Sequence, residues 1–241
     1  MAMIVGIDWG RVGARVQRLE RAWGTPAGPP PLAEAEVADA ERELGIVFPE
    51  DYRQYLLRVS AGGTGPSRIR PLSRRGADGW GWEGDLHTDV GALASAFPAR
   101  STYEAEWGAL DAEEPVPGRF RDGSAFDKAS RAWDARCEEL HEVQTRGAVF
   151  LGDDGCGFVL LIVSGPERGA VWYDRRATSD AIVPLLGADG THASFGDLYM
   201  EWLDRAERAV ETARRDGTEP RVRRVVTPIF ETRFGNRGHR A

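Results

Sequence analysis

Apolar residues recur every three or four positions through the first sixty residues, a period that predicts amphipathic helices. The first helix is expected from about Asp8 to Trp23, and the second from about Ala33 to Leu44, where Gly45 ends it. Pro49 stands in the first turn of a third helix, where proline is tolerated, and Gly62-Gly63 ends that helix. The chain is therefore predicted to open with three helices.

The middle of the chain has no clear period. A short strand is expected at residues 67–72, and residues 73–126 are interpreted as an insertion or as long loops that carry short helices. A clean helical stripe returns at residues 126–143. We therefore place a long central insertion at about residues 73–145.

Short β-prone runs follow, namely GAVFLG, GFVLLIVSG, GAVWYDR and DAIVPLL, separated by turns rich in glycine and polar residues. A last helix is expected after Ser194, its N-cap, with Asp197 three residues later. Helices, meandering strands and a closing helix predict an α+β fold, with an antiparallel-rich sheet packed against the N-terminal helices and the C-terminal helix. Residues 1–213 then form one domain, and residues 214–241 a basic C-terminal extension.

The 241-residue chain is acidic, with a net charge of −7 that is spread unevenly. Residues 74–145 carry −7 and residues 146–213 carry −5, whereas the C-terminal extension carries +5. An acidic body disfavours direct nucleic-acid binding and favours a basic protein partner, although ordinary solubility needs a net charge of similar size. The longest apolar run, FVLLIV, is too short to cross a bilayer, and neither a signal-peptide pattern nor a secreted cysteine framework is present. A cytoplasmic location without membrane contact is expected.

Residues that could carry catalysis or hold a metal are scattered. The four histidines lie far apart, and none stands near a cysteine or carboxylate at ligand spacing. Asp153-Asp154 is typical of a turn, and Cys156 beside it has no partner base. MIVGIDWG resembles the first phosphate-binding hairpin of sugar kinases and actin-like ATPases, but the expected hydroxyl residues do not follow Asp8. No catalytic residue, metal site or cofactor is therefore predicted, and an enzyme that uses Asp8 or Asp153 is kept only as a third hypothesis.

Two features favour protein binding. In the glycine-rich stretch DGWGWEGD, large aromatics in an exposed loop would anchor an interface while neighbouring carboxylates steer a basic partner. The alternative is that both indoles fold back onto the core. The candidate binding residues are Trp80, Trp82, Glu83 and Asp85, with Glu113 and Glu114 as weaker ones. The second feature is the Arg-rich tail, where an edge strand at RVVTPIF is favoured over a solvated end or an arm onto an acidic surface.

The stretch ERELGIVFPEDYRQYLLRVSAGG resembles the N-terminal signature of the SUKH superfamily, which contains fungal cell-wall-assembly regulators of the Smi/Knr type and many bacterial immunity proteins. VFLGDDGCGFVLLIVSGPERGAVWYDR is similar to the glycine-rich hairpin and following strand of that family, and SFGDLYMEWL to its closing helix. Ala61 stands where Asn is usual, and the central insertion is longer than in compact members. The residues that carry the resemblance, which we interpret as structural, are Leu44, Gly45, Pro49, Tyr52, Leu56, Gly62, Gly63, Gly152, Asp154, Gly155, Gly157, Gly169, Trp172, Phe195 and Trp202.

The resemblance implies a SUKH-like fold and a non-enzymatic, protein-binding function. The first hypothesis is an immunity protein that neutralises a toxin, often a nuclease, whose basic cleft would attract an acidic surface. The second is a housekeeping adaptor that binds endogenous proteins, as the fungal relatives are thought to do. Gene neighbourhood and co-expression with the product of the neighbouring gene would separate these hypotheses.

Overall fold

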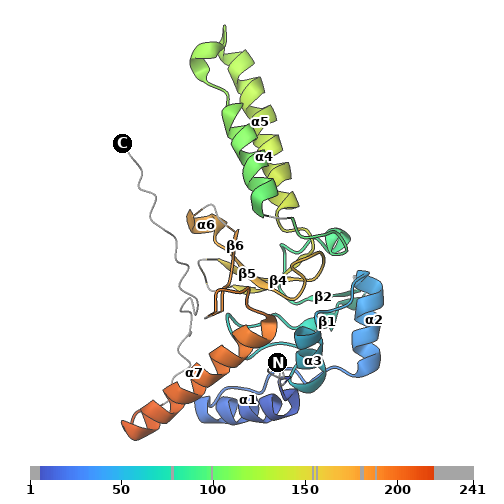
Figure 1. Cartoon of the computed structure of the whole chain (residues 1–241), viewed down its shortest axis with the longest axis vertical. Helices are drawn as coiled ribbons and strands as arrows, with labels where there is room; N and C mark the ends of the chain where they lie inside the picture. The colour runs from blue at the N-terminus through green and yellow to red at the C-terminus, as the bar shows by residue number, and fades with distance from the viewer. Residues whose placement is uncertain are drawn as a thin grey trace.

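The structure, a computed structural model, describes residues 6–76, 79–98, 100–153, 155, 157–179, 182–187 and 189–219 (Figure 1). The helices are α1 (Trp9–Trp23), α2 (Glu34–Leu44), α3 (Glu50–Arg58), α4 (Arg100–Ala112), α5 (Gly123–Val143), α6 (Arg176–Ser179) and α7 (Phe195–Arg215). Short 3-10 turns lie at Val90–Ala92 and Pro117–Arg119. The strands are β1 (Leu72–Arg74), β2 (Trp80–Trp82), β3 (Ala148–Asp153), β4 (Phe158–Ile162), β5 (Val171–Asp174) and β6 (Ile182–Pro184).

The helix ends follow local sequence signals. Asp8 caps α1 by accepting a hydrogen bond from the backbone nitrogen of Arg11 at 3.1 Å. Pro49 is the N-cap of α3, one position before the first turn in which it was expected. Ser194 and Asp197 form the predicted capping box of α7. The three opening helices and the closing helix are thus confirmed, and Asp8 has a structural role in α1.

Strands β3 to β6 form an antiparallel sheet in sequence order, which confirms the predicted meander and the α+β class. Alternate side chains face opposite sides of the sheet. Val149 and Leu161 join the core beneath α1, α3 and α7, whereas Phe150 and Leu160 join a smaller cluster that includes Phe97. Because both faces are covered, the strands are continuous apolar runs rather than alternating ones.

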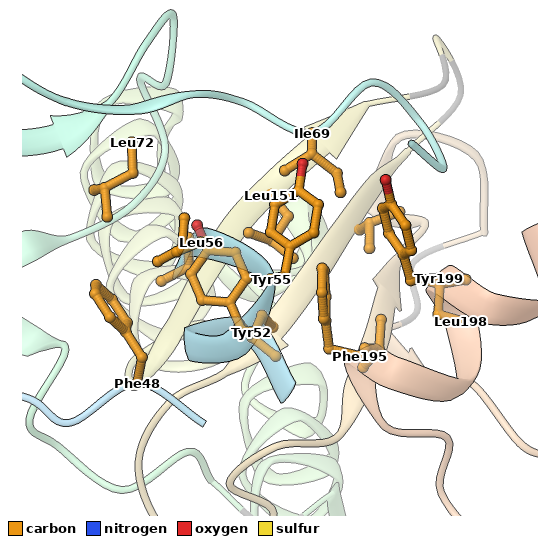
Figure 2. Close-up of a cluster of buried hydrophobic side chains, with 14 of the residues drawn as sticks. Phe48, Tyr52, Tyr55, Leu56, Ile69, Leu72, Leu151, Phe195, Leu198 and Tyr199 are labelled. Carbon is orange, nitrogen blue, oxygen red and sulfur yellow. The ribbon is translucent and has the colours of Figure 1, made fainter. Parts of the chain in front are cut away.

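An aromatic cluster fixes α3 and α7 to each other and to the sheet. Figure 2 shows Tyr52 and Tyr55 of α3 beside Phe195 and Tyr199 of α7, with Phe48 at one end. The ring centroids of Tyr52 and Phe195 lie 5.2 Å apart, and those of Tyr55 and Tyr199 lie 5.0 Å apart. All five side chains are almost fully buried. The apolar stripe of the third predicted helix is therefore the centre of the core.

The central insertion differs from the sequence prediction. Helices α4 and α5 pack against each other as an antiparallel hairpin that projects from the body (Figure 1). The loops with short helices expected at residues 73–126 are wrong for α4, which has 13 residues, whereas the helix expected at residues 126–143 is confirmed as α5, which begins three residues earlier. The strand expected at residues 67–72 is also displaced: β1 begins at Leu72 and pairs with β2.

Two contacts attach the base of the hairpin to the sheet. The hydroxyl of Tyr103, in the first turn of α4, donates to the carbonyl oxygen of Ile182 at 3.0 Å. Arg176 forms a two-nitrogen ion pair with the buried Asp174 and also donates to the carbonyl oxygen of His141, near the end of α5. Each helix of the hairpin is thus fixed at its end nearest the body.

A close backbone approach explains the paired glycines of the resemblance. A Cβ atom on Gly62 would lie 2.4 Å from Cα of Pro71, so no larger residue fits without a backbone shift. Gly63 has φ of 99°, a conformation that side chains other than glycine rarely adopt. Two predictions fall outside the described residues: the roles of Asp154 and Cys156 in the β3–β4 turn, and the edge strand at residues 224–230.

Candidate partner-binding surfaces

Trp80 and Trp82 do not lie in an exposed loop, which corrects the sequence interpretation. They form β2 with Gly81 and stand on the same face of that strand, toward α2 and α3. Only 6% of Trp80 and 1% of Trp82 are exposed. The indole nitrogen of Trp80 donates to a carboxylate oxygen of Asp39 at 2.8 Å, so the residue is held in place by a helix of the body. The alternative that both indoles fold onto the core is the observed arrangement.

The two carboxylates that follow β2 have different environments. The side chain of Asp85 is 5% exposed and accepts hydrogen bonds from the backbone nitrogens of His87 and Thr88 at 3.0 and 3.3 Å. Arg70 lies 3.8 Å from it. Asp85 therefore stabilises a turn, and its carboxylate is buried. Glu83, in contrast, is exposed.

A groove of about 590 Å³ separates α2 from the edge of β1. Leu32, Leu72 and Trp80 contribute apolar surface, and Glu36 and Glu83 contribute charge. The pKa of Asp39, which also lines the groove, is lowered by the indole hydrogen bond and then by Arg74. Since arginine already pairs with this carboxylate, the groove does not form a strongly acidic surface.

The α4–α5 hairpin carries the acidic surface. Between residues 100 and 143 the chain has eleven carboxylates and six basic side chains, and all eleven carboxylates are exposed. Four of them lie seven or four positions apart along α5, which places them on one side of that helix: Asp127, Asp134, Glu138 and Glu142. The pKa of the Cys137 thiol is raised by partial desolvation and then by the negative charges of Asp134 of α5 and Asp111 of α4.

Glu113 and Glu114 lie where α4 ends, at the tip of the hairpin. Glu113 is paired with Arg136 of α5 at 2.5 Å, with both side chains more than half exposed. Among the described residues, no ion pair involves Glu114. The tip lies far from β2 (Figure 1). Because Glu83 directly follows β2, the six candidate binding residues do not form one surface.

Helix α4 and strand β2 were not predicted, although the sequence contains a signal for each of them. Tyr103, Trp107 and Leu110 follow a helical spacing that could have identified α4, and the alternation in Trp80-Gly81-Trp82 is typical of a strand. Neither pattern is long. Both patterns lie in a segment that was interpreted as loops because it is rich in glycine and charged residues.

Clusters suited to metal chemistry are not found in the described ranges, where no three His, Cys, Asp or Glu side chains gather so as to share an ion. Asp153, the other residue of the enzyme hypothesis, ends β3 and lies 3.7 Å from Arg70. None of the helices within the same ranges is long and apolar enough to span a bilayer.

Comparison with known proteins agrees with this architecture. Residues 31–186 match the sequence model of the SMI1 / KNR4 family (SUKH-1). The match extends from just before α2 through β6, so it includes α3, both sheets and the inserted hairpin, and covers more than half of the chain. No curated protein and no solved structure matches the chain. The chain therefore belongs to the SMI1 / KNR4 family (SUKH-1).

Proposed function

We propose that the protein is a non-enzymatic binding protein of the immunity type, which neutralises a basic toxin in the cytoplasm through the acidic surface of the α4–α5 hairpin. The observation that carries this proposal is the hairpin itself, which projects from the body (Figure 1). It carries eleven exposed carboxylates. The described residues that carry the family resemblance lie instead in the body, where they take part in packing and turns.

The physical basis is electrostatic steering. A surface with an excess of one charge attracts an oppositely charged partner over several ångströms and raises the association rate by about ten- to a thousandfold at low salt. Nucleases bind phosphate groups through basic clefts, so a nuclease toxin is the class of partner that an acidic projection would block most readily. Family membership is compatible with this function.

Co-expression tests the proposal directly. The product of the neighbouring gene is expected to arrest growth when it is produced alone and to be harmless when this protein is produced with it. A neighbouring product that is not toxic, or that is equally toxic in the presence of this protein, would contradict the immunity function. A pull-down that recovers several endogenous partners from unstressed cells would then favour the adaptor hypothesis.

Charge reversal tests the surface. Replacing Asp134 and Glu138 by Lys changes two carboxylates on the acidic side of α5, and we expect the association rate to fall at least about tenfold at low salt. The matched control replaces Glu211 and Glu219 by Lys, which gives the same net charge at exposed positions in and after α7. Equal losses in both variants would show that net charge, rather than the hairpin, controls association.

A further inference from the structure

The tip of the hairpin contains an apolar pocket of about 330 Å³. Its walls come from the connection that follows α4, residues 113–120, and from α5 between Ala129 and Arg136. The apolar lining includes Val116, Phe120, Ala132 and Trp133. Val116 is 46% exposed, which is unusual for a large aliphatic side chain at the end of a projecting element.

The walls of this tip pocket are held by specific contacts. The indole nitrogen of Trp133 donates to the carbonyl oxygen of Leu110 at 2.9 Å, which joins α5 to the last turn of α4. Phe120 packs edge-on against Phe126 with ring centroids 5.7 Å apart. Pockets that are already formed before binding require little reorganisation, and this one lies within the usual size range of about 300–1,000 Å³.

Charge around the tip pocket differs from charge along the hairpin. The rim has two glutamates, Glu113 and Glu114, and two arginines, Arg119 and Arg136, so the pocket itself is close to neutral. The flanks of the hairpin carry the excess of carboxylates. In protein interfaces with a neutral apolar centre, one side chain of the partner that is buried in the centre supplies most of the affinity. The charged residues around the centre increase the rate at which the partner associates.

We propose that the tip pocket receives one apolar side chain of the partner, presented on a segment whose neighbouring residues are lysine or arginine. This inference rests on the proposed function and identifies the part of the toxin surface that is recognised. Docking of a second copy of the chain is disfavoured because two acidic hairpins repel each other. The apolar contact fixes the complex, and the charged flanks bring the partner to it.

The test fills the tip pocket without removing any contact. Ala132 is exposed and lines the pocket, so Ala132→Phe places a ring in the space that the partner would occupy. Ala135 is exposed on the same helix and outside the pocket lining, so Ala135→Phe is the matched control. Binding of the neighbouring gene's product is measured by calorimetry, and circular dichroism verifies that both variants are folded. We expect Ala132→Phe to weaken binding by at least about tenfold and Ala135→Phe to leave it unchanged.

A second variant guards against misfolding of the first. Val116→Glu introduces a carboxylate at the mouth of the tip pocket, where docking would bury it, and we expect a similar loss of affinity. If the wild-type protein binds and protects but all three variants do so equally, the tip pocket is not the contact and the proposed function stands. Equal losses in Ala132→Phe and Ala135→Phe also overturn the inference. If the wild-type protein does not bind the toxin, the proposed function fails and this inference fails with it.

Discussion

The indole nitrogen of Trp82 donates a hydrogen bond to the hydroxyl oxygen of Tyr52 at 2.9 Å, and both side chains are almost completely buried. This contact joins β2, which precedes the inserted hairpin, to α3 at the centre of the core. Trp82 is therefore part of the buried core of the body.

Loss of this acceptor should destabilise the protein. Tyr52→Phe keeps the ring and leaves the Trp82 nitrogen without a partner, so we expect the free energy of unfolding to fall by about 1–3 kcal/mol. Urea denaturation measures the change. The double variant Tyr52→Phe/Trp82→Phe should lose less than the sum of the single variants, because it leaves no donor unpaired. Additive losses would contradict an energetic role for the hydrogen bond.

Three buried tyrosines predict a loss of stability at high pH. Burial raises the pKa of Tyr52, Tyr55 and Tyr199 above the ordinary value of 10.0, because the phenolate is disfavoured inside the core. The unfolded chain releases these protons above about pH 10 whereas the folded chain keeps them. Stability from these groups is therefore complete below pH 10 and falls as the pH rises above it, by up to about 1.4 kcal/mol per pH unit for each tyrosine.

Urea midpoints between pH 8 and pH 11.5 measure this dependence. Tyr199→Phe removes one of the three groups and should make the decline shallower. An identical decline in the variant would show that other groups cause it. Absorbance of tyrosinate in the folded protein gives a second reading, since these three phenols should not ionise until the chain unfolds.

The sequence predicted the body of the fold because its signals there are local. A Ser194–Asp197 capping box marks the start of α7, and the apolar runs separated by turn residues mark β3 to β6. Strand β2 could not be predicted in the same way. It has only three residues, so its alternating Trp80-Gly81-Trp82 pattern is too short to predict a strand, and the pairing with β1 and the packing of its indoles against α2 and α3 are tertiary contacts.

The close packing of Gly62, one of the paired glycines of the N-terminal family resemblance, gives a further prediction. Gly62→Ala would place a methyl group 2.4 Å from Cα of Pro71, and we expect a loss of at least about 2 kcal/mol in unfolding free energy from the forced backbone shift. Gly108 of α4 is the control, because a methyl group added there would have no neighbouring atom within 4 Å. Gly108→Ala should stabilise the helix by up to about 1 kcal/mol. Similar effects at both positions would contradict the packing argument.

The attachment of α5 to the sheet should depend on Arg176. Arg176→Met leaves the carboxylate of Asp174, which is 5% exposed, without its partner, and we expect a loss of about 3 kcal/mol in unfolding free energy. Amide exchange near the end of α5 should also accelerate, because the hydrogen bond to His141 is lost. Arg205→Met breaks a pair with Glu201 in which both side chains are about one third exposed, far more than Asp174, and it should cost less than about 0.5 kcal/mol. Comparable losses in the two variants would contradict the role of burial.

For the candidate binding surface, the sequence predicted that the surface is acidic but not where on the fold the carboxylates lie. The acidic composition of residues 74–145 is visible in the sequence, whereas its concentration on a projecting pair of helices depends on how α4 and α5 pack. The tip pocket is less predictable still, because Val116, Phe120 and Trp133 meet only when the chain turns between the two helices.

The inserted helices leave and re-enter the body at one point. Gly147, just after the hairpin, donates to the carbonyl oxygen of Ala92, and a side chain on it would collide with the backbone of Ser95 and Phe97, just before the hairpin. Because the two ends are adjacent, mutation could lengthen, shorten or replace the segment between them without disturbing the remainder of the fold. The hairpin proposed to recognise a toxin could therefore change rapidly in evolution while the body of the fold is kept, as expected for a protein that coevolves with its toxin.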